Sequence, residues 1–284
     1  MSFADWKNVI GQLEEYRKKT GENICITIWG GEPLISPYFD DLLVLVKQRG
    51  FETEVITNGF FIDQHKTVIE NYADRLYISL DGTEEIHDEI RGTGVFKKIV
   101  GNLRELNHRN IIIMSVISEK LIHNLQVFFT ELDNLNIKSL FLQELICFDV
   151  TEIAAYKKWM KNTFGVEAKD IDSWQGTDKR SFSDALKMIL QGEKKYHYHI
   201  EHKIHTSNKD IFCVSPFRHM HITWNGAVTY CTDFYDFTAG NVKDSSVEEI
   251  FFNELSEKYC ESVKQGNCVL CNHCSWRNRK AEEY

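Results

Sequence analysis

The fold is decided by the stretch Ile24-Cys25-Ile26-Thr27-Ile28-Trp29-Gly30-Gly31-Glu32-Pro33, in which a short apolar run leads into a polar turn. A nearly continuous apolar and β-branched run of this kind is typical of a strand that is buried on both faces. Glycines let the backbone approach a ligand closely, and a carboxylate beside them can accept hydrogen bonds from an ammonium group. We therefore expect a buried strand that ends in a binding turn, with an ordinary strand-to-helix turn as the alternative.

The same strand-then-helix pattern recurs along the first half of the chain. Further strands are expected at Glu52–Thr57, Leu76–Leu80, Ile111–Ile117 and Ser139–Leu142. Helical stretches separate them, around Phe39–Lys47, Ile62–Tyr72, Val95–His108 and Ile122–Leu132. This alternation predicts an α/β fold of parallel strands, either an open doubly wound sheet or a segment of a barrel. Functional residues then belong at the carboxyl ends of the strands.

The chain is expected to contain a β/α domain over residues 1–150, a helical connecting region over 151–212 and a small Cys-rich domain over 213–284. Ser2 and Asp5 are placed like a capping box that opens the first helix, and Gly21 is expected to stop it. Later helices are expected at Tyr156–Phe164, Phe182–Leu190 and Val247–Tyr259. The alternating stretch Tyr196–His202 is assigned to the connecting region.

Composition and charge limit the class of protein. The 284 residues are 43% hydrophobic and 26% charged, as in ordinary globular proteins. A net charge of −9 argues against binding to the nucleic-acid backbone. No apolar run approaches the roughly 20 residues that cross a bilayer, and the start lacks the features of a secretory signal. We expect a cytoplasmic protein with small-molecule or peptide partners, no nucleic acid and no membrane.

Three more polar motifs follow predicted strand ends: Thr57-Asn58-Gly59, Ser79-Leu80-Asp81-Gly82 and the stretch His87–Phe96, which reads HDEIRGTGVF. An Asn amide offers a donor and an acceptor, and an Arg in the last motif can pair bidentately with a carboxylate. Each motif alone also suits a turn. Together along one parallel sheet they would build a single rim, which is much more specific.

GGEP, TNG, SLDG and HDEIRGTGVF, in this order and at this spacing, resemble the core of radical S-adenosylmethionine (SAM) enzymes over about residues 1–145. The resemblance implies a partial (β/α)6 TIM barrel that binds SAM. It implies that the methionine amino group of SAM meets Gly30, Gly31 and Glu32. It also implies carboxylate and ribose contacts from Asn58, Ser79 and Arg91, and it places the strand end Leu142–Glu144 near the adenine.

Eight cysteines need an explanation in a reducing compartment, and six of them lie at or after Cys213. The stretches Cys213–Phe217, His221–Cys231, Gly240–Val242 and Cys271–Trp276 resemble the SPASM module, which binds auxiliary [4Fe–4S] clusters. By this resemblance the ligands are Cys213, Cys231, Cys271 and Cys274, with Cys268 in reserve because Cys268-x-x-Cys271 has the same spacing. Four thiolates can enclose such a cluster, and a zinc site of the same ligands is the alternative.

The other cysteines and the histidines are assigned to ordinary roles. Thiols expected to pack as small hydrophobes are Cys25, Cys147 and Cys260. A solvated strand face is expected for His197, His199, His202 and His205, and packing is expected for His219 and His221.

One family motif is absent from the sequence. A radical SAM enzyme needs a Cys-x-x-x-Cys-x-x-Cys loop after its first strand, and none occurs here. We therefore expect an incomplete barrel without that strand. Truncation of an active enzyme is favoured over a natural pseudoenzyme and over a chain that works with a partner polypeptide supplying the strand and thiols.

The resemblance implies that the family activity is hydrogen abstraction from a peptide or protein by a 5′-deoxyadenosyl radical. The chain as it stands is expected to be inactive, and no catalytic residue is assigned. A reductant such as a flavodoxin or ferredoxin would be a partner. The main alternative is a non-catalytic peptide-binding module with a structural iron–sulfur or zinc site. A nucleotide-binding α/β protein is disfavoured because no G-x-G-x-x-G follows a strand.

Overall fold

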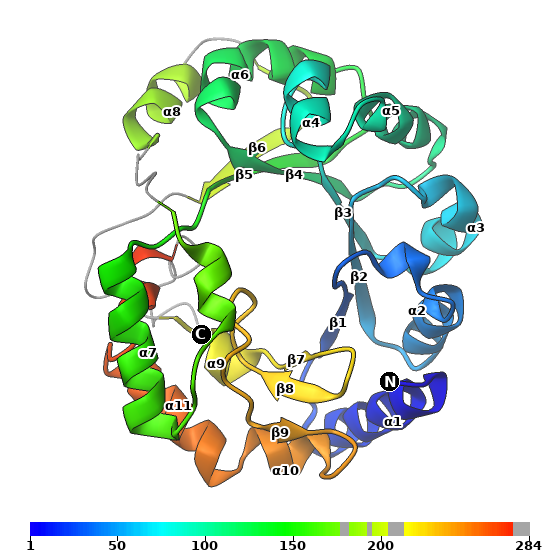
Figure 1. Ribbon diagram of the computed structural model, residues 1–284. Coiled ribbons are helices and arrows are strands. Elements are labelled where there is room, and N and C mark those ends of the chain that lie inside the picture. The colour runs from blue at the N-terminus through cyan, green and yellow to red at the C-terminus, as the bar shows by residue number, and fades with distance from the viewer. Residues whose placement is uncertain (177–181, 192–194, 204–212, 275–284) are drawn as a thin grey trace. The chain divides into compact units, whose positions relative to one another are not determined.

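The computed structural model describes residues 1–176, 182–191, 195–203 and 213–274 (Figure 1). They form two compact units, each built from segments that are distant in the sequence. The first unit comprises Met1–Tyr16, Ile146–Ser181 and Ile204–Tyr284, and the second comprises Arg17–Leu145 and Phe182–Lys203. These units do not follow the three successive ranges expected from the sequence, because part of the expected connecting region belongs to each unit. The predicted sheet residue His205 lies outside the described residues.

Six parallel strands form one sheet in the second unit, and each strand pairs with the next one in the sequence. They are β1 (Cys25–Ile28), β2 (Glu52–Thr57), β3 (Arg75–Ser79), β4 (Ile111–Ile117), β5 (Ser139–Glu144) and β6 (His199–Lys203). A doubly wound sheet reverses its strand order at a switch point, whereas this order runs in one direction as in a barrel wall. The predicted α/β partial barrel is therefore confirmed.

Helices cover the outer face of this sheet (Figure 1). They are η1 (Pro33–Ile35), α2 (Phe39–Gln48), α3 (Ile62–Tyr72), α4 (Glu84–Arg91), α5 (Val95–Glu105), α6 (Glu119–Leu132) and α8 (Ser183–Leu190). Alternate strand residues such as Val55, Ile78 and Leu140 are fully buried. The residues between them, such as Glu54 and Tyr77, are half-buried on the opposite face of the pleated sheet.

The expectation that the first strand is buried on both faces is wrong. Among the described residues β1 pairs with β2 alone, so it forms an edge of the sheet. Cys25 and Thr27 are exposed, and Ile26 and Ile28 are half-buried. The apolar run therefore reflects packing on one face, and Cys25 is an exposed thiol rather than a packed one.

The region after β5 differs from its sequence assignment in one respect. The alternating stretch that was expected within a connecting region supplies β6, with Ile200 in register with Leu140 of β5. The two expected helices are present as α7 (Val150–Phe164) and α8. A capping box at Asp149 and Glu152 starts α7 earlier than the apolar spacing indicated.

The first unit packs helices and a small antiparallel sheet around an aromatic core. The predicted capping box is present, because Ser2 and Asp5 exchange hydrogen bonds at the start of α1 (Phe3–Thr20). The sheet contains β7 (His221–Ile222), β8 (Ala227–Thr229) and β9 (Gly240–Asn241). The other elements of the first unit are α7, η2 (Asp170–Trp174), α9 (Ser215–Arg218), α10 (Val247–Phe251), α11 (Glu254–Lys264) and η3 (Val269–His273).

The single helix expected near the end of the chain is instead two helices, α10 and α11. Asn253 breaks the run, because its side chain accepts a hydrogen bond from the Ser256 amide and caps α11. Tyr259 of α11 then stacks on Phe237 with ring centroids 4.2 Å apart. No helix within the described ranges is long and apolar enough to cross a membrane.

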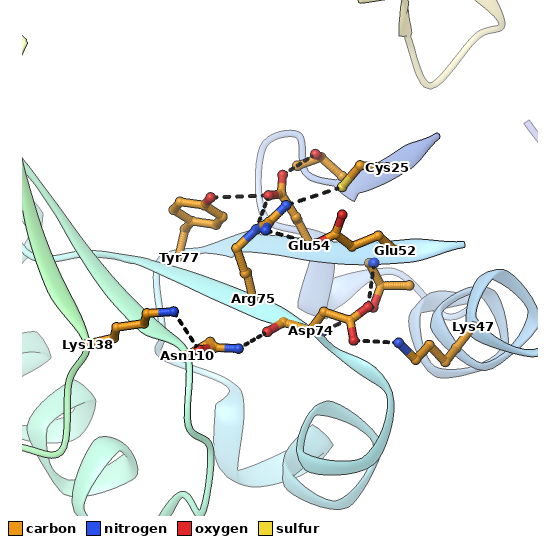
Figure 2. Close-up of polar contacts among 11 residues, drawn as sticks. Cys25, Lys47, Glu52, Glu54, Asp74, Arg75, Tyr77, Asn110 and Lys138 are labelled. Atoms are coloured by element: carbon orange, nitrogen blue, oxygen red, sulfur yellow. Dashed lines mark hydrogen bonds and ion pairs between the residues drawn. The ribbon is translucent and has the colours of Figure 1, made fainter. Parts of the chain in front are cut away.

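A polar network joins β1, β2 and β3 across the sheet (Figure 2). Glu54 accepts hydrogen bonds from the Thr27 hydroxyl at 2.7 Å, from Arg75 Nε and from the Tyr77 hydroxyl at 3.2 Å. Arg75 Nη1 also pairs with Glu52 at 2.8 Å. The Cys25 residue is exposed, but its sulfur faces this network; partial desolvation of the thiol, followed by the charge of Glu54, raises its pKa to about 11. These groups satisfy one another, so the network is a structural feature.

A second network in Figure 2 centres on Asp74 at the amino end of β3. Asp74 accepts hydrogen bonds from the Thr53 amide at 2.8 Å and the Thr53 hydroxyl at 3.0 Å, and it pairs with Lys47. The Asp74 carbonyl accepts from Asn110, whose side-chain oxygen accepts from Lys138. Burial opposes ionisation of Asp74, but the Lys47 and Thr53 contacts outweigh it and lower the pKa of the carboxyl.

We predict that Glu54→Gln lowers the free energy of unfolding by about 1–2 kcal/mol, because a partly exposed charged hydrogen-bond acceptor is lost. Urea unfolding followed by circular dichroism measures the change. Glu89→Gln is the matched control, because Glu89 pairs with Lys120 on the open surface. Equal losses in the two variants would contradict the structural role of the network.

We also predict a pH-dependent effect of Asp74→Asn. Because the pKa of Asp74 is lowered on folding from its ordinary value of 3.8, the ionised group stabilises the fold above about pH 4. This stabilisation is lost as the pH falls through the lowered folded value. The melting temperatures of wild type and variant should therefore differ at pH 7 and converge on acidification. A difference that stays constant down to pH 2.5 would exclude this origin.

Candidate functional site

Glu32 joins the first two predicted binding turns at the carboxyl ends of β1 and β2. One carboxylate oxygen accepts hydrogen bonds from the Leu34 amide at 3.1 Å and the Thr57 hydroxyl at 2.6 Å. The other oxygen accepts from the Asn58 amide at 2.7 Å. A carboxylate has about four acceptor positions, so these donors leave about one for a ligand. The fold therefore fixes Glu32 and keeps some of its hydrogen-bonding capacity.

The turn after β2 requires a glycine. Gly59 has a φ of +82°, and a Cβ built there would lie 2.9 Å from Ile78 Cγ2. Asn58 accepts a hydrogen bond from the Phe60 amide at 2.9 Å, which closes the turn and leaves the Asn58 side-chain NH2 for other partners. Asn102 of α5 is buried and donates to the carbonyls of Gly59 and Phe60. The sequence motifs did not indicate Asn102.

The third and fourth motifs meet in an ion pair. Ser79 ends β3 on its half-buried face, and Asp81 follows it with only 3% of its surface exposed. Arg91, at the end of α4, donates from Nε to Asp81 Oδ2 at 2.7 Å. The Val116 amide of β4 reaches Asp81 Oδ1 at 3.3 Å. Asp81 was not among the predicted site residues, although it belongs to the SLDG motif.

Asp88 folds the loop that follows Arg91. Its carboxylate accepts hydrogen bonds from the Gly94 amide at 2.6 Å and the Phe96 amide at 2.8 Å. These bonds lower the pKa of the Asp88 carboxyl. The Asp88 side chain, which extends from α4, thereby accepts hydrogen bonds at the start of α5 and connects the loop to α4.

At the next predicted position, Glu144 at the end of β5 is buried and accepts from the Phe182 amide at 3.0 Å.

The structure places the predicted SAM residues on neighbouring strand ends of the parallel sheet. Gly30, Gly31 and Glu32 follow β1, and Asn58 follows β2. Ser79 and Arg91 lie at the end of β3 and at the end of the helix after it. Direct hydrogen bonds connect the first turn to the second, and the third motif to the fourth. Carboxylate, amide, hydroxyl and guanidinium groups at one edge suit a ligand that has both an ammonium group and a carboxylate.

The thiols of the first unit gather around the aromatic core. The Cys271 thiol donates to the sulfur of Cys268, which lowers the pKa of Cys268 and raises that of Cys271. The pKa of Cys271 is raised further by burial and by the neighbouring Cys213 and Cys231. Burial raises the pKa of Cys231, as do Asp233 and Cys274. All five thiols therefore share one neighbourhood, and the reserve residue Cys268 is among them.

The donor chemistry of this neighbourhood fits an iron–sulfur cluster, for which several thiolates in apolar surroundings are the usual ligands. Among the residues that the structure describes, no three His, Cys, Asp or Glu side chains converge closely enough to hold a single metal ion. Cys260 donates to the Pro216 carbonyl at 3.2 Å.

The histidines have the surroundings of ordinary structural residues. Burial, with a smaller effect of His219, lowers the pKa of His221 to about 4. His197 contacts Asp133 at 2.9 Å and the Leu135 carbonyl at 3.0 Å. His199 and His202 are exposed on β6.

Comparison with protein families gives two matches. Residues 2–119 match the model of the radical SAM superfamily, and residues 213–275 match the SPASM model, an iron–sulfur cluster-binding domain. A cysteine-type anaerobic sulfatase-maturating enzyme of Clostridium novyi is 23% identical, over 90% of this chain and 71% of its own length. The mycofactocin maturase MftC of Mycobacterium tuberculosis is 33% identical, over 37% of this chain and 27% of its own.

Among solved structures, SuiB of Streptococcus suis bound to S-adenosylmethionine has the same fold, with a TM-score of 0.69 and 12% identity. The match covers 96% of this chain and 64% of SuiB, so the chain spans less than two thirds of that protein. SuiB bound to its precursor peptide SuiA matches with a TM-score of 0.63 and 17% identity.

We predict that Gly59→Ala lowers the free energy of unfolding by about 2 kcal/mol, because a side chain at positive φ is strained and its Cβ would meet Ile78. Gly101→Ala is the control. Gly101 lies within α5 with nothing within 4 Å of a built Cβ, so this change should stabilise the protein by about 0.5–1 kcal/mol. Chemical unfolding of both variants gives the values, and a neutral Gly59→Ala would refute the strained turn.

Proposed function

Because the chain is a radical SAM protein with a C-terminal SPASM domain, we propose that it takes part in the modification of a peptide or protein by hydrogen abstraction. The observation that carries this proposal is the rim at the strand ends, where Glu32 joins the first two turns and Asp81 joins the last two motifs. Relatives described as maturases of mycofactocin and of sulfatase, together with SuiB bound to a precursor peptide, support a peptide substrate.

The residues of the rim divide the recognition of SAM among them. Glu32 offers its remaining acceptor position to the ammonium group, and Gly30 and Gly31 let the backbone approach it. Arg91 pairs with the carboxylate, and Asn58 and Ser79 hydrogen-bond the carboxylate and ribose. When SAM is bound at a reduced iron–sulfur cluster, it supplies a 5′-deoxyadenosyl radical. The strand end 142–144 lies near the adenine in this arrangement.

The auxiliary [4Fe–4S] cluster is assigned to Cys213, Cys231, Cys271 and Cys274, with Cys268 as the alternative fourth ligand. SPASM domains bind such clusters, and the shared neighbourhood of the five thiols supports the assignment. The surrounding aromatic residues limit access of water, which influences the reduction potential of a cluster. A flavodoxin or ferredoxin would deliver the electron, and the cytoplasm is the compartment where such partners and free thiols coexist.

The 284 residues contain no Cys-x-x-x-Cys-x-x-Cys motif, so the ligands of a radical-generating cluster are not among them. We therefore propose that this stretch of chain, by itself, binds SAM and substrate but does not cleave SAM. The same observation favours a second candidate, a non-catalytic peptide-binding module with a structural cluster. The two candidates differ in whether SAM is cleaved once the thiol ligands of a radical-generating cluster are supplied.

We predict that anaerobic reconstitution loads the chain with about four iron and four sulfide per molecule, which is one cubane cluster. Cys213→Ser and Cys231→Ser should abolish loading, and Cys25→Ser should not, because Cys25 lies on β1 in the other unit. Cys268→Ser and Cys274→Ser, compared with each other, identify the fourth ligand.

The same loaded sample tests turnover. With dithionite and SAM it should release no 5′-deoxyadenosine, since the 284 residues lack the Cys-x-x-x-Cys-x-x-Cys motif. Formation of 5′-deoxyadenosine by these residues alone would contradict the proposed division of labour. Binding of zinc without iron would overturn the cluster assignment.

A further inference from the structure

We propose that Asp81 and His87 are positioning residues that hold the Arg91 guanidinium in one orientation, so that it recognises the carboxylate of SAM. This inference rests on the proposed function, because it takes Arg91 as the group that binds the ligand. In this inference Asp81 and His87 do not contact the ligand themselves, and the buried carboxylate of the SLDG motif serves to orient Arg91.

The Asp81 carboxylate is a strong anchor because it is buried. Its side chain is 4% exposed, whereas that of Arg91 is 39% exposed. Asp81 accepts from Arg91 Nε at 2.7 Å and from the Val116 amide at 3.3 Å. A buried carboxylate without a cation is costly, so Asp81 strongly favours the Arg91 rotamer that reaches it.

This contact leaves the ligand-binding edge of Arg91 available. Asp81 uses Nε, and within the described part of the chain the two Nη atoms have no hydrogen-bond partner. The paired N–H groups of a guanidinium bind a carboxylate bidentately. An arginine whose orientation is already fixed loses less side-chain entropy when it binds a ligand. The ion pair with Asp81 therefore preorganises Arg91.

His87 holds the same aspartate from its backbone. The Asp81 amide donates to His87 Nδ1 at 3.0 Å, so the imidazole is neutral and carries its proton on Nε2. His87 and Arg91 are four residues apart on α4 and share one face of the helix. One face of α4 thus contacts Asp81 twice, at its amide through His87 and at its carboxylate through Arg91.

The surroundings of His87 keep it neutral. It is 1% exposed, and its ring meets the edge of Phe96 at a centroid distance of 6.2 Å. Its Nε2 atom is buried and has no hydrogen-bond partner among the described residues. Burial lowers the pKa of His87, Arg91 lowers it further, and Asp81 and Asp88 act in the opposite direction. A neutral His87 places no second cation beside Arg91.

The test compares two ligands that differ in the carboxylate. Equilibrium dialysis measures binding of SAM and of 5′-methylthioadenosine, which keeps the nucleoside but lacks the amino-acid group. Asp81→Asn should weaken SAM binding by about 10-fold or more, because a charged anchor is lost. Binding of 5′-methylthioadenosine should change less than about 2-fold, since Arg91 does not contact it. Asp63→Asn is the control, because Asp63 accepts from Lys98 at the same 2.7 Å on the surface.

His87 variants give an independent measurement if Asp81→Asn folds poorly. His87→Leu removes the acceptor for the Asp81 amide and should weaken SAM binding by about 3–10-fold. His87→Asn places an amide oxygen near the position of Nδ1 and should restore much of the affinity. In an Arg91→Ala background, Asp81→Asn should add no further loss, because the two residues act as one unit.

The outcomes separate this inference from the proposed function. Equal binding of SAM by wild type and Asp81→Asn, or an equal loss for both ligands, overturns the positioning role. An additive loss in the Arg91→Ala background overturns it too. If wild type binds neither ligand, or does not prefer SAM over 5′-methylthioadenosine, the SAM site itself is wrong and the inference falls with it.

Discussion

Parallel pairing of consecutive strands is the constraint on which the candidate site depends. Because β1 to β5 run in the same direction and neighbour one another in order, the residues that follow them meet at one edge of the sheet. Four short motifs between Gly30 and Phe96 thereby lie along one edge, where hydrogen bonds join the first motif to the second and the third to the fourth. Glu32 cannot reach Asn58 unless the register of β1 and β2 is correct. The Asp81–Arg91 pair forms within the segment after β3, and the amide of Val116 in β4 joins it to the next strand.

The two ends of the strands use charged residues in opposite ways. Toward the amino ends, Glu54 and Asp74 direct their contacts to protein partners such as Arg75, Thr53 and Lys47 (Figure 2). At the carboxyl ends, Glu32 keeps an acceptor position and Arg91 keeps its Nη groups. The first arrangement stabilises the sheet, and we propose that the second serves a ligand. Barrel enzymes commonly divide stability and function between the two ends in this way.

The sequence predicted much of this fold because the buried strands have strong patterns. The expected strand at Glu52–Thr57 has the observed bounds, since its alternating residues Thr53, Val55 and Thr57 are buried. The expectation failed at the sheet edges. β1 has the apolar letters of a central strand but a neighbour on one side only, and β6 has too many polar residues to stand out. Burial on the second face depends on long-range pairing, which local patterns do not contain.

The candidate site shows a similar limit, because the motifs contain the proposed ligand-contacting residues but did not indicate the residues that support them. Glu32 and Arg91 were proposed from the motifs. Asn102 lies outside the motifs, and His87 begins the fourth motif but was given no role; both side chains act through backbone groups of other residues. Nearly every residue has a backbone N–H and carbonyl, so the residue type of the partner does not show that such a hydrogen bond forms. Motif spacing therefore cannot reveal it. The thiols differ again, because Cys268, Cys271 and Cys274 repeat one spacing and only contact geometry distinguishes them. Asn102 and His87 were therefore identified as supporting residues only from the folded structure. The Gly59 carbonyl and the Asp81 amide that they contact belong to the sequence motifs.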